Sequence, residues 1–565
     1  MGRGTRMRRA LVFLPCLFCL AVPVTAQHEH PAALPGQTMK SSSEPEVIGW
    51  APRELLERPV SLRDGLGPVH QEVTTSSSEA QKYYDQGLAY LHSYVWIEAA
   101  RSFNQSLRLD PKMAMAYIGL SRTYSGLTDP QAAREAVHNA QSLASSVSNW
   151  EQSRIQLRAQ QLDAIDDIDN QAKLEAYRKS IDAQLAKRPN DVELLLIRGN
   201  AEEPIAAGRG QLGLPTSVSF YERVLKLQPD HPAARHFLTH TYENMSMPEE
   251  ALKHGEVYAR VTPNIAHAQH MYGHDLQKVN RNAEAVAQFQ KAEQIEETYY
   301  REEHVEMKYD WHHIHNLDLM SISHAFMGQM KDAEALWREA FATPAVNGLW
   351  EAYKAKWPEF LIERGRADEA LLATQKLIAG RWPVGRTMGH ILAGRAYVHL
   401  NQLAKADAEL AASEREAASI EDVNPEPCLA HPRTYPVFEM KLLRTELALR
   451  RGKPDGGSTM RELLLEAKQG FRMADSTDSL FLMRLVAEDS RRMKNWKLAE
   501  FTAEQMLGFD PNYAGGHYEM GMVKIQTGQA DGARSELQKS VELWRNADPD
   551  LDELRQAKTQ LTALR

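Results

Sequence analysis

Apolar residues recur at intervals of three and four along most of the chain, which is the spacing of one face of an α-helix. From Glu79 onward Ala and Leu combine with Glu, Lys and Arg in this pattern, and no run of alternating strand residues interrupts it. Residues 27–78 lack the pattern and are rich in Pro, Ser and Gly, so we interpret them as a linker or extended arm. The pattern predicts an all-α chain from residue 79 to residue 565.

Small and large apolar residues recur in a frame of about 34 residues within the helical part. Small residues let the two helices of a hairpin approach closely, large apolar residues fill the space to the next hairpin, and proline ends the second helix. The copies are marked by Gly87, Tyr90, Ala99, Phe103 and Pro111; Pro229, Tyr242, Ala251 and Pro263; Gly273, Ala285, Phe289 and Ala292; Gly328, Ala333, Trp337 and Ala340; Gly365 and Ala370; Gly394, Tyr397 and Ala406; Ala499 and Pro511; and Gly521, Gly528, Ala533 and Leu537.

This frame predicts an α-solenoid of tetratricopeptide (TPR) helix-turn-helix repeats. Because the copies stay in phase near both ends, we expect the solenoid to fill residues 79–565 without a separate catalytic domain. Two stretches between clear copies, near 205–216 and 299–313, are predicted to be insertions at the edges of the stack.

The front half also resembles a narrower group of proteins. The segments HQEVTTSSSEAQKYYDQGLAYL, HPAARHFLTHTYENMSMPEEALKHG and HAQHMYGHDL are similar to a His-rich group of exported bacterial TPR proteins without an assigned reaction. The resemblance covers residues 68–316 and implies a TPR fold and export. Members of that group typically read HMPSH where this chain has His270-Met271-Tyr272-Gly273-His274, so the proline and serine of the motif are missing.

The amino end has the three parts of a secretory signal peptide. Four arginines within residues 3–9 precede an apolar run over 10–22, and Val24-Thr25-Ala26 offers small residues for cleavage before Gln27. The run of about 13 apolar residues is short for a membrane-spanning helix, which needs roughly 20. We expect residues 1–26 to be removed and the protein to be periplasmic or secreted, with no membrane span after cleavage.

Charge and cysteine content narrow the choice of partners. The formal net charge is −9, and it becomes −13 once the four arginines of the signal are removed, which argues against nucleic acid or an anionic membrane as the main partner. Of the three cysteines only Cys428 lies outside the signal, so the mature chain can form no internal disulfide. We expect a monomer stabilised by packing.

Histidines gather in one part of the chain. Residues 236–315 hold 10 of the 21 histidines, where an even spread would give about three. The repeat frame places many of them on the first helices of three neighbouring repeats, at places that face the concave groove in TPR proteins. They are His236 and His240 on one helix, His267, His270 and His274 on the next, and His315, with Asp318, on the third.

This arrangement predicts a possible metal site. Imidazoles three or four residues apart on a helix lie about 5–6 Å apart, which suits one metal ion. One helix cannot complete a site, so we expect a pair from one helix and a third ligand from its neighbour. Neutral imidazole favours zinc or copper(II), with binding that weakens as pH falls through about 6.5. The candidate ligands are His236, His240, His267, His270, His274 and His315, and replacing His270 and His274 is expected to abolish binding.

Two other interpretations of the histidines stay open. Each can hydrogen-bond a neighbouring repeat and so rigidify the array, and together they can recognise an acidic or aromatic peptide. The predicted groove residues beside them are Asp318, His312, His313 and Asn316. Asn316 either orients a ligand or caps a helix, and the segment around His312 either covers the groove or braces two helices.

No known catalytic motif is present in the sequence. Residues 208–213 match GxGxxG without a preceding strand, and the acidic group at 163–169 lacks the glycine and glutamate of a calcium loop. The first function predicted is therefore an exported, non-enzymatic scaffold that binds a protein or peptide in its concave groove. The alternative is a transition-metal-binding protein or metal-dependent enzyme that uses the histidines.

Overall fold

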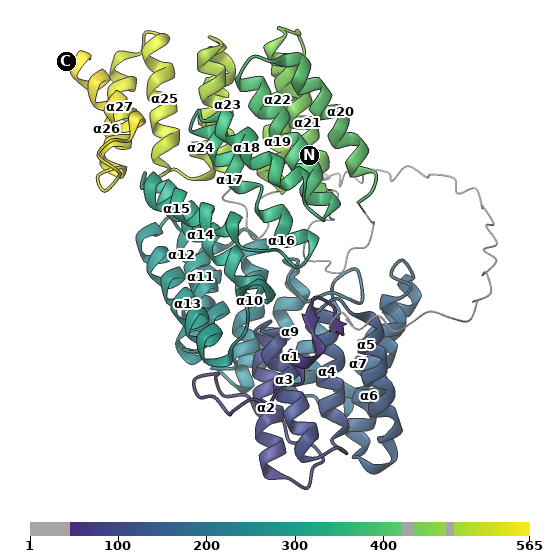
Figure 1. Cartoon of the computed structure of the whole chain (residues 1–565). Helices are drawn as coiled ribbons and strands as arrows, with labels where there is room; N and C mark the ends of the chain where they lie inside the picture. Colours follow the sequence, from purple (N-terminus) through teal and green to yellow (C-terminus); the bar gives the residue numbers. More distant parts are fainter. Residues whose placement is uncertain (1–45, 421–433, 471–478, 565) are drawn as a thin grey trace, which may run out of the picture. The chain divides into compact units, whose positions relative to one another are not determined.

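The computed structural model describes residues 46–420, 434–470 and 479–564, and most of them lie in α-helices that pair into hairpins (Figure 1). The predicted signal peptide, the first part of the predicted arm and Cys428 lie outside the described residues. Each hairpin contacts the next along the chain. The all-α solenoid of TPR-type hairpins predicted from the sequence is confirmed.

The helices fall into hairpins, a few short elements and a closing helix. The hairpins of the front half are α2 (Ser78–His92) with α3 (Trp96–Leu109), α4 (Ala114–Gly126) with α5 (Pro130–Ser142), α6 (Asn149–Ile165) with α7 (Gln171–Lys187), α8 (Val192–Asn200) with α9 (Pro215–Leu227), α10 (Pro232–Asn244) with α11 (Pro248–Val261), α12 (Ala266–Lys278) with α13 (Asn282–Glu303), and α14 (Trp311–Phe326) with α15 (Met330–Ala342).

The back half continues the same pattern. Its hairpins are α17 (Lys356–Glu363) with α18 (Ala367–Ile378), α19 (Pro383–His399) with α20 (Leu403–Ala417), α21 (Thr434–Arg450) with α22 (Gly456–Gly470), α23 (Ser479–Arg492) with α24 (Trp496–Phe509), and α25 (Ala514–Gln526) with α26 (Ala530–Leu543). The elements outside these pairs are β1 (Val47–Ile48), β2 (Ala51–Pro52), α1 (Arg53–Leu56), the 3-10 turns η1 (Ala144–Ser146) and η2 (Met307–Tyr309), α16 (Gly348–Tyr353) and α27 (Asp552–Ala563).

The same local devices recur from hairpin to hairpin. A Cβ on Gly87 would lie 2.6 Å from the Phe103 ring, so glycine lets α2 and α3 close on each other. The pair Gly273 and Phe289 repeats this contact at 2.8 Å between α12 and α13. One residue with a left-handed φ turns the chain between the two helices of most hairpins: Tyr94, Thr128, Ser246, Asn280, Gly328, Gly365, Asn401, Gly452, Lys494 and Gly528.

The described part of the predicted arm, residues 46–77, is attached to the first helices. Strands β1 and β2 pair antiparallel, and Ile48 of β1 is buried. Further along, the Arg63 amide donates to the Gln86 side chain at 2.8 Å, and the Thr74 amide donates to Glu151 at 2.8 Å. Packing and hydrogen bonds therefore hold this part of the arm along α2 and α6.

The two predicted insertions differ from each other. Residues 201–214 form an irregular loop between α8 and α9, closed by Glu203, whose carboxylate accepts from the Arg209 and Leu212 amides at 3.1 Å each. Residues 299–313, by contrast, include the end of α13 and the start of α14, and the connection between these helices is only 304–310. The extended α13 braces the structure, because the Tyr299 hydroxyl donates to Glu98 of α3 at 2.9 Å.

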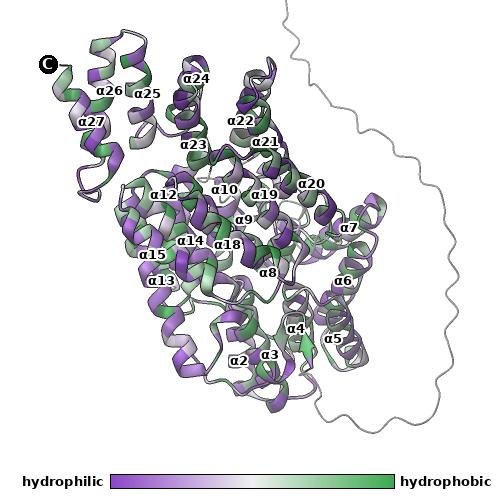
Figure 2. Ribbon diagram, turned by 45° about the horizontal axis from the view of Figure 1, so that its top comes forward, coloured by the Kyte–Doolittle hydropathy of each residue, from purple (hydrophilic) through white to green (hydrophobic). Residues whose placement is uncertain are grey.

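Hydrophobic and hydrophilic residues are mixed along the labelled helices (Figure 2). This is expected when each helix buries one face against its neighbours and leaves another face in water. Among the described residues, none of the helices combines the length and the apolarity needed to cross a bilayer.

Candidate metal centre

Helices α10, α12 and α14 are the first helices of three successive hairpins and carry the predicted histidines. Pro232 begins α10 with a φ suited to a helix start, and the His231 ring caps it by accepting from the Ala234 amide at 3.5 Å. Asp310 caps α14 by accepting from the His312 amide at 3.0 Å. Because α12 contacts both α10 and α14, the three helices present their histidines to one another.

The histidines are enclosed, although the repeat frame suggested an open groove. His236 is fully buried, His267 is 4% exposed and His240 is half-buried. Tyr94, at the turn between α2 and α3, covers them with a ring whose centroid lies 4.7 Å from His236 and 5.8 Å from His267. Trp311, whose indole donates to the Tyr94 carbonyl at 3.1 Å, packs 5.5 Å from His267. The ring of Tyr94, from the turn between α2 and α3, and the ring of Trp311, from the start of α14, therefore cover the face that the frame left open.

Three imidazole nitrogens converge inside this enclosure. The Nε2 atom of His240 lies 3.1 Å from Nε2 of His236, and Nε2 of His267 lies 3.0 Å from the same atom. The ligand atoms of all three residues lie within 4.8 Å of one another. Two imidazoles bound to one tetrahedral zinc ion, at 2.0–2.1 Å each, have nitrogens about 3.3 Å apart. The cluster thus has nearly the spacing that a metal ion requires.

The tautomer of His236 makes this convergence unusual. Its Nδ1 lies 2.6 Å from the His92 carbonyl, which can only accept, so Nδ1 carries the proton and donates. In neutral His236, Nε2 then holds a lone pair. That lone pair accepts one good hydrogen bond, yet His240 and His267 both approach it. The Nε2 atoms of His240 and His267 therefore crowd around one acceptor, and a cation between the three nitrogens would bind all of them at once.

Burial keeps these imidazoles in the form that binds metal. It lowers the pKa of His236 to about 3, with smaller effects from His92 and Arg209. Burial and then the neighbouring His236 and His312 put the pKa of His267 well below its usual value. These rings are therefore neutral near pH 7, and in the folded protein they stay neutral well below the pH of about 6.5 expected from the sequence.

Glu243 of α10 lies next to the cluster. Its carboxylate is in close contact with Nδ1 of His274 and lies 3.7 Å from Nδ1 of His240, too far to orient that ring by a hydrogen bond. His274 therefore lies beside Glu243 and does not belong to the group of three converging ligands.

His270 points away from the converging nitrogens, toward α14. Its Nδ1 donates to the Asn316 side-chain oxygen at 3.1 Å, and its ring lies 4.4 Å from His312 and 4.7 Å from His315, measured between centroids. The Asn316 amide nitrogen in turn donates to the Phe289 carbonyl at 3.1 Å. Asn316 therefore orients a histidine from the middle of α14 and does not cap a helix.

The remaining predicted residues have separate partners. Asp318 accepts from the Trp337 indole at 2.8 Å, within the hairpin of α14 and α15. His313 lies against Glu293 and Glu296 of α13, and none of these residues belongs to the group of converging imidazoles. Asp318 is thus a packing residue in the structure, whereas His313 belongs to a second cluster.

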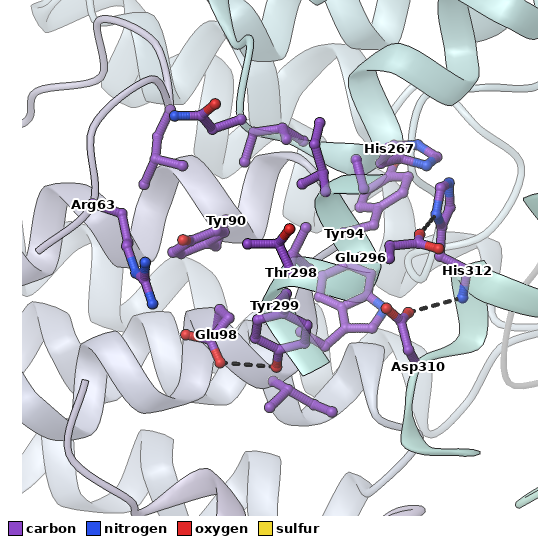
Figure 3. A pocket seen from close by; sticks show the side chains of 18 of the residues that line it. Arg63, Tyr90, Tyr94, Glu98, His267, Glu296, Thr298, Tyr299, Asp310 and His312 are labelled. Atoms are coloured by element: carbon purple, nitrogen blue, oxygen red, sulfur yellow. Dashed lines mark hydrogen bonds and ion pairs between the residues drawn. The ribbon is translucent and has the colours of Figure 1, made fainter. Parts of the chain in front are cut away.

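A pocket of about 700 Å³ opens beside the cluster (Figure 3). Its walls include the rings of Tyr94, Tyr299 and Trp311, and its lining reaches His267 and His312. The pocket thus borders His267, one of the three converging imidazoles.

Several residues that shape the centre escaped the sequence analysis. His92 contributes its backbone carbonyl, which no side-chain pattern reveals, and Tyr94 lies at an irregular turn far from the histidines in sequence. The position of Glu243 next to His240 could have been predicted, because it follows His240 by three residues on one face of α10.

No protein-family model and no curated protein matches the chain. Solved structures with some likeness include the APC/C hetero-tetramer Cut9-Hcn1 (14% identity, 85% of this chain and 76% of that chain, TM-score 0.32), the human IFIT1 dimer with PPP-AAAA (13%, 77% and 91%, 0.36) and yeast Tom70 (12%, 86% and 95%, 0.32). With TM-scores this low, the fold assignment rests on the hairpins of the chain itself. By these hairpins the chain is a TPR-like helical-repeat protein.

Proposed function

We propose that the protein binds one transition-metal ion through His236, His240 and His267. The observation that carries this proposal is the approach of two Nε2 atoms, of His240 and His267, to that of His236, at 3.1 and 3.0 Å, with His236 and His267 buried. A metal ion at the centre accepts all three lone pairs at once.

The donor set favours zinc or copper(II). All three ligands are imidazoles, which suit both ions, and the three cysteines of the chain lie outside the described residues. Three protein ligands leave a fourth position for water or a small molecule, as in catalytic zinc sites. This open position favours a site that uses or transfers its metal over a closed structural site.

The helical repeats supply a second candidate function for the rest of the surface. Stacked hairpins form extended surfaces that repeat proteins use to bind other proteins. This scaffold role was the first function predicted from the sequence. It now applies to surfaces outside the cluster, because the buried histidines are not available to a peptide.

Export is part of the proposal and has its own test. The basic, apolar and small-residue parts of residues 1–26 support cleavage before Gln27. Amino-terminal sequencing of the protein recovered from outside the cytoplasm is expected to begin near Gln27. Recovery of that protein with Met1 intact would argue against a cleaved signal.

Metal content tests the main proposal. The full-length protein, produced without a histidine tag and isolated from its native compartment, is expected to contain about one equivalent of zinc or copper by elemental analysis. After removal of the metal by a chelator, the protein should take up one equivalent again at micromolar concentration. If it takes up neither ion under these conditions, the metal proposal is wrong.

A further inference from the structure

We infer a second, chemically different cation site at Glu293 and Glu296 of α13 and His313 of α14. The ligand atoms of these residues all lie within 4.8 Å of one another. Nδ1 of His313 lies 3.1 Å from Oε1 of Glu293 and 3.8 Å from Oε2 of Glu296. His313 is fully buried and Glu296 is 2% exposed, so the protein encloses the space between them.

Each carboxylate is held by one oxygen and offers the other. Oε2 of Glu293 accepts from the Asn316 amide at 3.2 Å, and Oε1 of Glu296 accepts from Nδ1 of His312, a contact visible in Figure 3. The opposite oxygens of both residues face His313. Oε2 of Glu296 is buried and has no hydrogen-bond partner among the described residues. Carboxylates that ligate metals are fixed by outer hydrogen bonds in this way.

The backbone supports the same geometry. Glu293 and Glu296 are three residues apart on α13 and therefore share one face of the helix. His313 lies in the first turn of α14, which packs against α13. Two helices in contact thus bring the three side chains together without any contribution from a loop.

The ligand type separates this site from the imidazole cluster. Two carboxylates and one imidazole suit harder divalent cations such as Mn²⁺, whereas three neutral imidazoles suit zinc and copper. The two sites share no ligand, and His312, whose ring lies 5.1 Å from that of His267, stands between them. The inference therefore does not rest on metal binding by His236, His240 and His267.

A competing explanation uses the same distances. A protonated His313 between two carboxylates forms a buried ion pair that needs no metal. The two explanations differ in what happens when Mn²⁺ is offered, because an ion pair alone takes up no manganese.

The test is a Mn²⁺ titration of the chelator-treated, full-length protein, with free Mn²⁺ followed by electron paramagnetic resonance. The wild-type protein is expected to bind about one Mn²⁺ per chain. The double variant Glu293→Gln and Glu296→Gln should bind it at least 10-fold more weakly, while the control Glu297→Gln, an exposed position on the same helix, should bind normally. Should the double variant fail to fold, Glu293→Gln alone, at the less buried carboxylate, is expected to show the same loss.

Variants of the first cluster make the result specific. Replacing His236 and His240 with alanine should leave Mn²⁺ binding intact even where zinc binding is lost. The inference is overturned if the wild-type protein binds no Mn²⁺, if the glutamine variants bind it as tightly as the wild type, or if the His236 and His240 variant loses it. None of these results depends on whether zinc binds to the imidazole cluster.

Discussion

Replacing His240 and His267 with alanine is expected to abolish stoichiometric binding of zinc and copper(II). These substitutions remove two of the three converging nitrogens and leave His236 without a partner ligand. Loss of a single outer-shell partner already weakens metal binding by about 10–100-fold, so loss of two direct ligands should exceed about 100-fold. Competition with a chromophoric chelator, using chelator-treated protein, measures this change.

A matched control is the substitution His254→Ala. This histidine lies on α11, where its ring stacks on Tyr242 at 5.4 Å and takes no part in the cluster. Its loss should leave metal affinity unchanged. Circular dichroism should show that the double variant keeps its helices. A folded double variant that still binds one zinc ion with wild-type affinity would contradict the assignment of ligands.

The metal-free protein is expected to lose stability steeply as pH falls from 7 to 5. Burial lowers the pKa of His236 to about 3 despite the raising effect of its hydrogen bond to the His92 carbonyl, whereas a histidine in the unfolded chain titrates near 6.5. Between these values the unfolded state binds more protons than the folded state, so stability falls with pH. His236 alone should contribute a loss of about 2 kcal/mol at pH 5.

Other histidines change this loss in known directions. Burial also lowers the pKa of His231, to about 4, and of His267, so both add to it. Glu293 and Glu296 outweigh the burial of His313 and raise its pKa to about 10, so in the metal-free protein the protonated ring offsets part of this loss. Urea unfolding at pH 7 and pH 5 measures the difference. Equal free energies of unfolding at both values would show that the cluster is not held in the neutral form.

The fold was predictable because its signals are local. Gly87, Phe103 and their counterparts recur because the two helices of a hairpin pack closely, and each hairpin needs a small and a large residue at the same places. The pairing of His236 with His240 was also predictable, since four residues on a helix bring two rings to one face. Their meeting with His267 required only that successive first helices lie side by side.

The centre as a whole depends on contacts that sequence periodicity does not encode. On α12 the three histidines diverge: His267 turns toward α10, His270 toward Asn316 of α14, and His274 toward Glu243. Their spacing of three and four residues along one helix suggested equal roles, and with it an essential role for His270 and His274. The structure does not place either in the group of converging nitrogens, so their replacement should affect metal binding less than replacement of His240 and His267.

The repeat frame also could not predict that the histidines are buried. The frame describes one hairpin and its neighbours, whereas the rings that close the centre come from the turn at Tyr94 and from Trp311. The cluster of Glu293, Glu296 and His313 depends on how the second helix of one hairpin faces the first helix of the next. These features are set by tertiary packing between segments and appear only in the folded chain.

The most direct test of the proposed metal centre is the location of the metal itself. Anomalous diffraction from crystals of the zinc-loaded protein, collected at the zinc edge, is predicted to show a peak between His236, His240 and His267. The three Nε2 atoms should lie at about 2.0–2.1 Å from the ion, the usual zinc to imidazole distance. A stoichiometric zinc ion bound elsewhere, with these three imidazoles unligated, would contradict the account.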